Sequence, residues 1–117
     1  MVKGEKEMYL ENGEGLIAFV SASLTVDATS GGVPIASAST HSTGYGQPAE
    51  KVFMTLETAQ IRFTVDSTAP TATIGHLLEV GQNLTLSGPQ EIKAFRAFRT
   101  GTTSGALYIT SWCRGGK

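Results

Sequence analysis

Apolar and polar residues alternate over residues 51–57 and again over residues 60–66. Successive side chains of a β-strand point to opposite faces of the sheet, so a period of two predicts strands with one packed face and one solvated face. Phe53 is the exception, because it falls on the nominally outward face of the first segment. Only Thr58 and Ala59 separate the two segments, and a connection this short is typical of a β-hairpin.

Shorter and less regular apolar segments predict the remaining strands. These segments are bounded by clusters of turn-forming residues. They cover residues 16–20, 23–26, 33–35, 74–80, 83–86, 95–99 and 106–112. We expect segment 74–80 to form a hairpin with segment 83–86. Segment 95–99 is expected to form the final antiparallel pair with segment 106–112.

The chain shows no internal repeat and no amphipathic helix longer than two turns. Residues 87–90 contain Gly-Pro and are expected to open a single helical turn that reaches Ile92. The 117 residues include 15 Thr, 10 Ser and 14 Gly, a composition that favours strands joined by turns. We therefore predict an all-β fold, a small antiparallel β-sandwich or partly closed barrel of about seven to nine short strands.

The alternation also predicts which side chains form the core. A chain of this length can bury one core of modest size. The predicted core comprises Val52, Met54, Leu56, Ile61, Phe63, Val65, Leu84, Leu86, Phe95, Leu107 and Ile109. Large-to-small substitutions at these positions should therefore destabilise the fold.

The strand around Phe63 is followed by turn-forming residues from Asp66 to Thr71. The Asp66 carboxylate can accept hydrogen bonds from the backbone N–H groups that follow it, and Pro70 favours an extended conformation at Ala69. Calcium sites usually draw on several carboxylates, whereas Asp66 stands alone. Asp66 and Pro70 are therefore interpreted as a structural turn.

Two segments contain little apolar surface of their own. Residues 1–14 predict an extended N-terminal arm or a poorly ordered tail, and residues 36–48 predict a long loop within a single domain that spans residues 15–117. Ordering a backbone costs about 1–2 kcal/mol per residue, which burial of these segments on their own core cannot offset. We expect partners to order both segments.

The formal net charge is −1, so nothing in the overall charge favours nucleic acid or a membrane as a partner. Residues 1–14 carry a net −2 from two lysines and four glutamates, whereas residues 88–117 carry a net +4 from five basic residues and one acidic residue. One interpretation is that these ends contact each other between neighbouring subunits, and the other is solvated charge at both ends. The candidate subunit contacts are Glu5, Glu7, Glu11, Glu14, Arg96, Arg99 and Arg114.

Candidate chemistry is sparse. His41 and His76 have no nucleophile motif near them, and together with the single Cys113 they do not have the spacing of a zinc site. His76 is interpreted as a structural residue, His41 as a solvated loop residue and Cys113 as an incidental or semi-buried thiol. The glycines do not form a phosphate-binding loop. We expect no enzymatic activity, no cofactor and no metal.

Residues 93–99 interleave aromatic and basic side chains, as some nucleic-acid surfaces do. A period of two separates Phe95 from Arg96 and Phe98, so these side chains cannot form one platform. The first residues lack the apolar region of a secretion signal, and the longest apolar run is too short to span a bilayer. We expect synthesis in the cytoplasm and binding to neither nucleic acid nor membrane.

Six short motifs between Val52 and Trp112 occur in an order that resembles a small domain of tailed-bacteriophage virion proteins. In that family, T-x-E-T-A-x-I-R-F/Y-x-x-D is followed by S/G-T-x-P-T, G-H-L-L, G-x-x-L-x-L, F-R-x-x-R-T-G and L-x-I/V-T-x-W/Y. The matching segments are Thr55–Asp66, Ser67–Thr71, Gly75–Leu78, Gly81–Leu86, Phe95–Gly101 and Leu107–Trp112. Ser67 stands where the family often has glycine, and residues 1–48 are not covered.

The resemblance implies a non-enzymatic virion structural protein, with a capsid decoration or cement protein as the leading expectation. Its implied partners are the major capsid protein or other virion proteins and many copies of itself, assembled in the host cytoplasm. A looser likeness to accessory β-sandwich domains of chitobiase-type glycosidases implies an alternative, a carbohydrate-binding or host-surface adhesion module. Such modules present several aromatic side chains on one face, whereas this chain has one Trp and three scattered Tyr.

Overall fold

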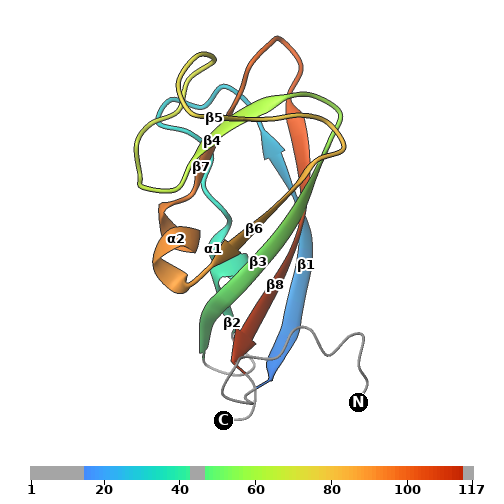
Figure 1. The fold of residues 1–117 in the computed structure, drawn as a ribbon, viewed down its shortest axis with the longest axis vertical. Helices are drawn as coiled ribbons and strands as arrows, with labels where there is room; N and C mark the ends of the chain where they lie inside the picture. The colour runs from blue at the N-terminus through green and yellow to red at the C-terminus, as the bar shows by residue number, and fades with distance from the viewer. Residues whose placement is uncertain (1–14, 43–46, 115–117) are drawn as a thin grey trace.

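The computed structural model describes residues 15–42 and 47–114. Within these ranges the chain forms eight strands and two short helices (Figure 1). In chain order they are β1 (Leu16–Val26), α1 (Ser37–Thr40), β2 (His41–Ser42), β3 (Gln47–Glu57), β4 (Ile61–Thr64), β5 (His76–Leu78), β6 (Asn83–Ser87), α2 (Pro89–Ala94), β7 (Arg96–Arg99) and β8 (Gly105–Arg114). The predicted arm at residues 1–14 lies outside the described residues.

The strands form two antiparallel sheets, which confirms the predicted all-β fold class. The five-stranded sheet is ordered β1–β8–β3, with β2 and β6 pairing with different parts of β3. The three-stranded sheet is ordered β5–β4–β7. Apolar side chains from both sheets form one buried cluster. The described strands do not close into a barrel.

The observed core is close to the predicted one. Eight of the eleven predicted residues are buried, and Phe63, Val65 and Leu84 are half-buried at the margin. Further buried residues include Val26, Ile35, Ala49, Leu78, Ile92, Ala97 and Cys113. Several of these lie in segments too short or too irregular for period two to mark an inward face.

The three predicted hairpins are wrong, because in each case the two segments belong to different sheets. Strand β3 pairs with β8 and β6, whereas β4 pairs with β5 and β7. Likewise β6 does not pair with β5, and β8 pairs with β1 and β3 instead of β7. Each of these connections crosses from one layer to the other. Alternation specifies which face of a strand is buried, not which strand lies beside it.

Three element boundaries can be compared with the predictions. Segments 16–20 and 23–26 are one continuous strand, β1, whose pairing with β8 has a register shift between Ala18 and Val20. The predicted helical turn is confirmed as α2. The strand predicted at residues 74–80 shortens to β5, because glycines with positive φ lie on both sides of it.

The segment before β3 is more ordered than the sequence predicts. The strand expected at residues 33–35 is a single bridge between Val33 and Ala97. The loop expected at residues 36–48 contains α1, β2 and the start of β3, while residues 43–46 lie outside the described part of the chain. The polar composition of this segment did not predict a strand. Strand β2 nevertheless pairs with the first residues of β3, because that pairing uses backbone atoms and does not need apolar side chains.

Candidate interaction surfaces

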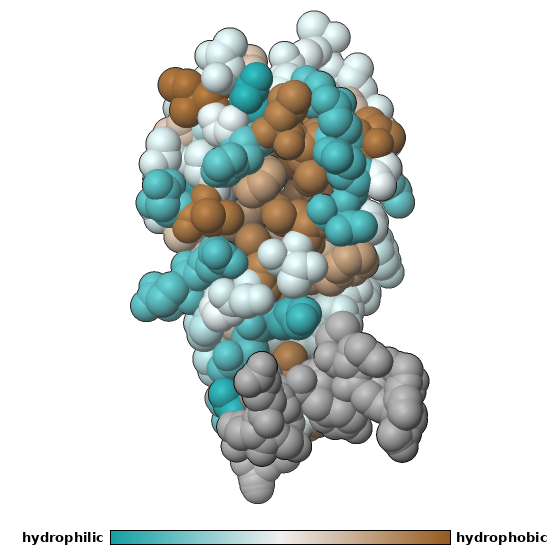
Figure 2. Space-filling model, in the orientation of Figure 1, coloured by the Kyte–Doolittle hydropathy of each residue, from teal (hydrophilic) through white to brown (hydrophobic). Residues whose placement is uncertain are grey.

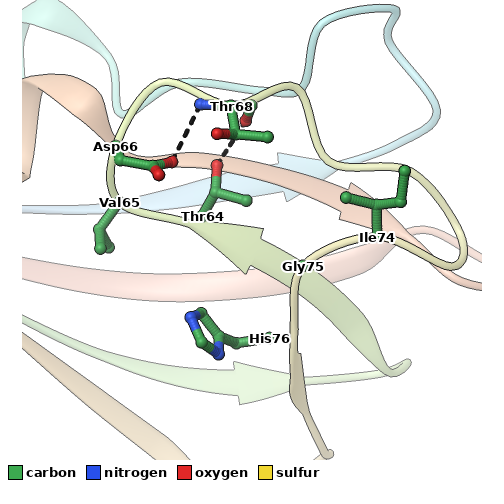
Figure 3. A pocket seen from close by; sticks show the side chains of 7 residues that line it. All are labelled: Thr64, Val65, Asp66, Thr68, Ile74, Gly75 and His76. Atoms are coloured by element: carbon green, nitrogen blue, oxygen red, sulfur yellow. Dashed lines mark hydrogen bonds between the residues drawn. The ribbon is translucent and has the colours of Figure 1, made fainter.

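The corner after β4 has the Asp66 hydrogen bond that the sequence predicts and a second bond that it does not. The backbone N–H of Thr68 donates to Oδ1 of Asp66 at 3.1 Å, and the Thr64 hydroxyl donates to the Thr68 carbonyl at 2.6 Å (Figure 3). Ser67 has a φ of 71°, in the left-handed region where glycine is favoured. Pro70 is fully buried. The corner is therefore held both by hydrogen bonds and by packing of the proline ring.

A surface pocket of about 400 Å³ lies beside this corner. Its lining consists of Thr64, Val65, Asp66, Thr68, Ile74, Gly75 and His76. The exposed His76 ring packs against Phe63, with ring centroids 5.4 Å apart. Figure 3 shows the Asp66 carboxylate turned toward Thr68 and the His76 imidazole apart from it. The imidazole and the carboxylate therefore do not form a hydrogen-bonded pair.

Hydrogen bonds set the chemistry of this pocket. The pKa of the Asp66 carboxyl is lowered, first by the side chain of Thr68 and then by its backbone N–H. The Thr64 hydroxyl donates to the Thr68 carbonyl, whereas the Thr68 hydroxyl hydrogen-bonds to the Asp66 carboxylate, whose lowered pKa makes it a weak base. Among the described residues no cluster of three metal-ligating side chains occurs.

The outward side of the five-stranded sheet is a second candidate surface. On β8, Leu107, Ile109 and Ser111 are buried, so the intervening side chains point outward. The register of β1 and β3 against β8, and of β6 against β3, identifies the further outward positions. We call this set the outer face, and it comprises Ser21, Ser23, Thr25, Lys51, Phe53, Thr55, Glu57, Asn83, Thr85, Ser87, Ala106, Tyr108, Thr110 and Trp112.

The outer face combines hydroxyl groups with three aromatic rings. Tyr108 is 49% exposed and Phe53 is 37% exposed, while Trp112 is half-buried. Phe53 lies opposite Thr110, which is midway between Tyr108 and Trp112 on β8. The Ser21 and Thr110 hydroxyls are 2.9 Å apart, in hydrogen-bond contact. The sequence had suggested scattered aromatics, and the β3–β8 pairing brings these three onto one surface.

The basic candidate contacts lie on different sheets. Arg96 and Arg99 belong to β7, whereas Arg114 ends β8. Nη1 of Arg96 donates to the carbonyls of Lys93 and Phe95 at 3.0 and 2.7 Å. The three arginines thus do not form a single patch on one sheet, and their proposed acidic partners Glu5, Glu7, Glu11 and Glu14 lie outside the described residues.

Arg99 is tied to the end of β1. Its backbone N–H donates to the Asp27 carbonyl at 3.1 Å. The pKa of the Asp27 carboxyl is lowered, mainly by hydrogen bonds from Thr29 and to a smaller extent by the charge of Arg99. This arginine therefore has a local structural role in addition to any contact with a neighbouring subunit.

Sequence reasoning missed the role of Arg62. Its Nε donates to the Ala72 carbonyl at 3.0 Å and its Nη1 to the Gly75 carbonyl at 2.9 Å. One guanidinium thus fastens the 71–75 loop to β4. The only signal in the sequence was an arginine on the polar face of a predicted strand. A solvated arginine without any structural role would show the same pattern.

Exposed apolar side chains form another feature that the sequence did not predict. Ile74, Leu77 and Val80 are all exposed and flank or belong to β5. Figure 2 shows hydrophobic residues gathered in a hollow on the upper half of the molecule, with hydrophilic residues around them. Nothing in the described structure indicates what covers these residues.

Two small polar side chains on β8 point into the core. Cys113 is a buried free thiol. The Ser111 hydroxyl is buried, and it has no hydrogen-bond partner among the described residues. Such a group is unfavourable relative to an apolar side chain of similar size.

No helix in the described ranges is long and apolar enough to cross a membrane. Comparison of the chain with protein-family models, with curated proteins and with solved structures gave no match. The functional argument therefore depends on the surfaces described above and on the motif resemblance.

Proposed function

We propose that this protein is a non-enzymatic structural component of a bacteriophage virion, a decoration or cement protein that attaches to the capsid in many copies. The outer face is the observation that carries the proposal. Lys51 and Glu57 are the charged members of this set, and most of the others bear hydroxyl, amide or aromatic side chains. Little charge has to be desolvated when such a face is covered by another protein.

The proposed partners are the major capsid protein, other virion proteins and further copies of this chain. Individually weak contacts are sufficient, because copies linked on a lattice reinforce one another through multivalency. In this proposal the glutamates of residues 1–14 contact Arg96, Arg99 or Arg114 of neighbouring copies, and the contact weakens as salt screens it. Assembly takes place in the host cytoplasm, and neither nucleic acid nor membrane is a partner.

A pair of matched substitutions tests whether the outer face binds the capsid. Tyr108 and Val80 are about equally exposed, at 49% and 53%, but only Tyr108 belongs to the outer face. Tyr108→Lys should lower occupancy on purified capsids at least tenfold, measured by co-sedimentation, while Val80→Lys leaves occupancy unchanged. Equal occupancy for the two variants, or no binding of the wild-type protein, would contradict the proposal.

Deleting residues 1–14 tests the contribution of the arm separately. The truncated protein should keep its circular dichroism spectrum and melting temperature but detach from capsids at lower salt. Undiminished occupancy and salt resistance would show that these residues are not the anchor.

The three aromatic side chains of the outer face favour a second candidate function, a carbohydrate-binding or host-surface adhesion module. Sugar rings stack on aromatic faces, and neighbouring hydroxyl groups can hydrogen-bond to them. Trp112 is the single tryptophan, so its fluorescence reports directly on binding. A saturable change with bacterial surface glycans that Tyr108→Ala weakens would favour this alternative, and no change with any glycan would rule against it.

A further inference from the structure

Strand β1 forms one edge of the five-stranded sheet and pairs on one side with β8. Among the described residues no strand pairs with its other side. Figure 1 shows the lower part of β1 on the right-hand side of the five-stranded sheet. An edge strand presents unpaired N–H and C=O groups, which makes it a template for another strand.

Soluble proteins usually protect such edges with short strands, lysines, prolines or bulges. Strand β1 has eleven residues and includes neither a charged residue nor a proline. Its one irregularity, the register shift between Ala18 and Val20, lies near one end. Residues 20–25 therefore remain a regular and unprotected edge, whereas Val26 at the end of the strand is fully buried.

We propose that a second copy of this chain pairs with this edge, with the two β1 strands antiparallel about a twofold axis near Ser23. The two five-stranded sheets then join into one continuous sheet. This inference identifies one contact between copies that the proposed virion function can use, and in that sense it rests on that function.

The two faces of β1 support pairing with itself. A twofold axis normal to the sheet keeps outward residues opposite outward residues, so Ser23 meets Ser23 of the second copy and Ser21 meets Thr25. On the inward side, Ala22 meets Leu24. Hydroxyl groups therefore meet hydroxyl groups, and apolar side chains meet apolar side chains.

The absence of charge on β1 also favours a second copy of this chain as the partner of this edge. In a symmetric contact every charged residue near the axis meets its own like charge, which is destabilising. Strand β1 has no charge to repel its copy, and β8 beside it carries none from Gly105 to Cys113. The register also avoids the irregularity near Ala18, since it uses only residues 21–25.

Substitution of Ser23 tests the contact, because its side chain is exposed and a change there should leave the monomer fold intact. The wild-type protein should sediment with twice the mass of one chain at micromolar concentration. Ser23→Lys should raise the dimer dissociation constant at least tenfold, because two lysines face each other across the axis. Thr85→Lys, an exposed outer-face position on β6, is the matched control and should leave it unchanged.

Charge reversal distinguishes this contact from a general loss of folding. Ser23→Glu alone should also dissociate, while an equimolar mixture of Ser23→Lys and Ser23→Glu should form a mixed dimer. A wild-type monomer at 100-fold higher concentration would overturn the inference, as would failure of the mixture to associate.

A cross-link tests the register. Directly opposed residues of an antiparallel pair have Cα atoms about 4.5–5.5 Å apart, within the range that a disulfide spans. Ser23→Cys should therefore form a covalent dimer under mild oxidation, much faster than Thr85→Cys. Cross-linking at equal rates would overturn the proposed register.

The two proposals can fail independently. A β1-paired dimer that does not bind capsids keeps the inference and contradicts the virion function. Binding to capsids by a protein that stays monomeric, with Ser23→Lys binding as well as the wild type, contradicts the inference and keeps the function.

Discussion

The two sheets of this protein are stabilised in different ways. Strands β1, β3 and β8 of the five-stranded sheet are ten or eleven residues long, whereas β4, β5 and β7 of the three-stranded sheet have three or four. The long strands align buried apolar side chains over many residues. The short strands are supplemented by side-chain bonds to backbone carbonyls, from Arg62, Thr64 and Thr100.

This difference indicates that one sheet is maintained mainly by burial and the other to a larger extent by local polar contacts. Substitutions in the core of the first should lower the stability of the whole domain. Substitutions of the polar contacts in the second should release loops while the core remains folded.

The largest effect is expected for Leu107→Ala in β8. Leu107 is fully buried, and removing its side chain should cost about 2–5 kcal/mol of unfolding free energy. The control is Leu77→Ala on β5, where the side chain is 43% exposed and the cost should stay near 0.5 kcal/mol. Denaturant melts measure both, and equal losses would contradict the assigned inward faces.

Arg62→Lys should have an intermediate effect in the three-stranded sheet. Lysine cannot reproduce both guanidinium bonds to the Ala72 and Gly75 carbonyls, and their loss should cost about 1–2 kcal/mol. Hydrogen exchange should quicken at residues 72–76 and remain slow in β8. Lys93→Arg, at an exposed position, is the control; faster exchange throughout the domain would show that the two sheets do not respond separately.

Ser111→Ala should change stability in the opposite direction. It removes a buried hydroxyl that lacks a partner among the described residues, so we expect about 1 kcal/mol of added stability. Ser21→Ala is the comparison, because it removes a hydroxyl in contact with Thr110 and should not stabilise. Destabilisation by Ser111→Ala would indicate that its hydroxyl is hydrogen-bonded after all.

The smallest effect concerns acid stability. The folded-state pKa of Asp66 lies below its ordinary value of 3.8, because Thr68 hydrogen-bonds to the ionised form. Its contribution is thus present above the unfolded pKa and is lost as the pH falls through the folded pKa. Asp66→Asn should therefore flatten the fall in melting temperature below about pH 4. An unchanged slope would show that these bonds contribute nothing measurable.

Alternation in the sequence predicted the fold class and most of the core, because burial of one strand face acts on consecutive residues. It did not predict strand neighbours, so all three hairpins were wrong. The positive φ of Thr58, in the connection between β3 and β4, had no signal, because neither glycine nor asparagine marks that position.

For the candidate surfaces too, local features were predictable from the sequence and features that depend on strand pairing were not. The turn at Asp66 was predictable, because its hydrogen bonds involve residues two apart. The outer face was not, because it depends on the register of strands distant in sequence. The outward position of Phe53 was correctly predicted, but its proximity to Tyr108 and Trp112 required the pairing of β3 with β8.

Pairing of β1 with β8 has a consequence for the order in which the protein folds. It joins Leu16 to Arg114 and Val26 to Gly105, so β1 has no partner strand until nearly all of the described chain has been synthesised. Contacts this distant in sequence form late and slowly. During translation the uncharged β1 segment therefore remains unpaired until β8 has been synthesised. A chaperone bound to β1 in that interval would prevent it from pairing with other chains.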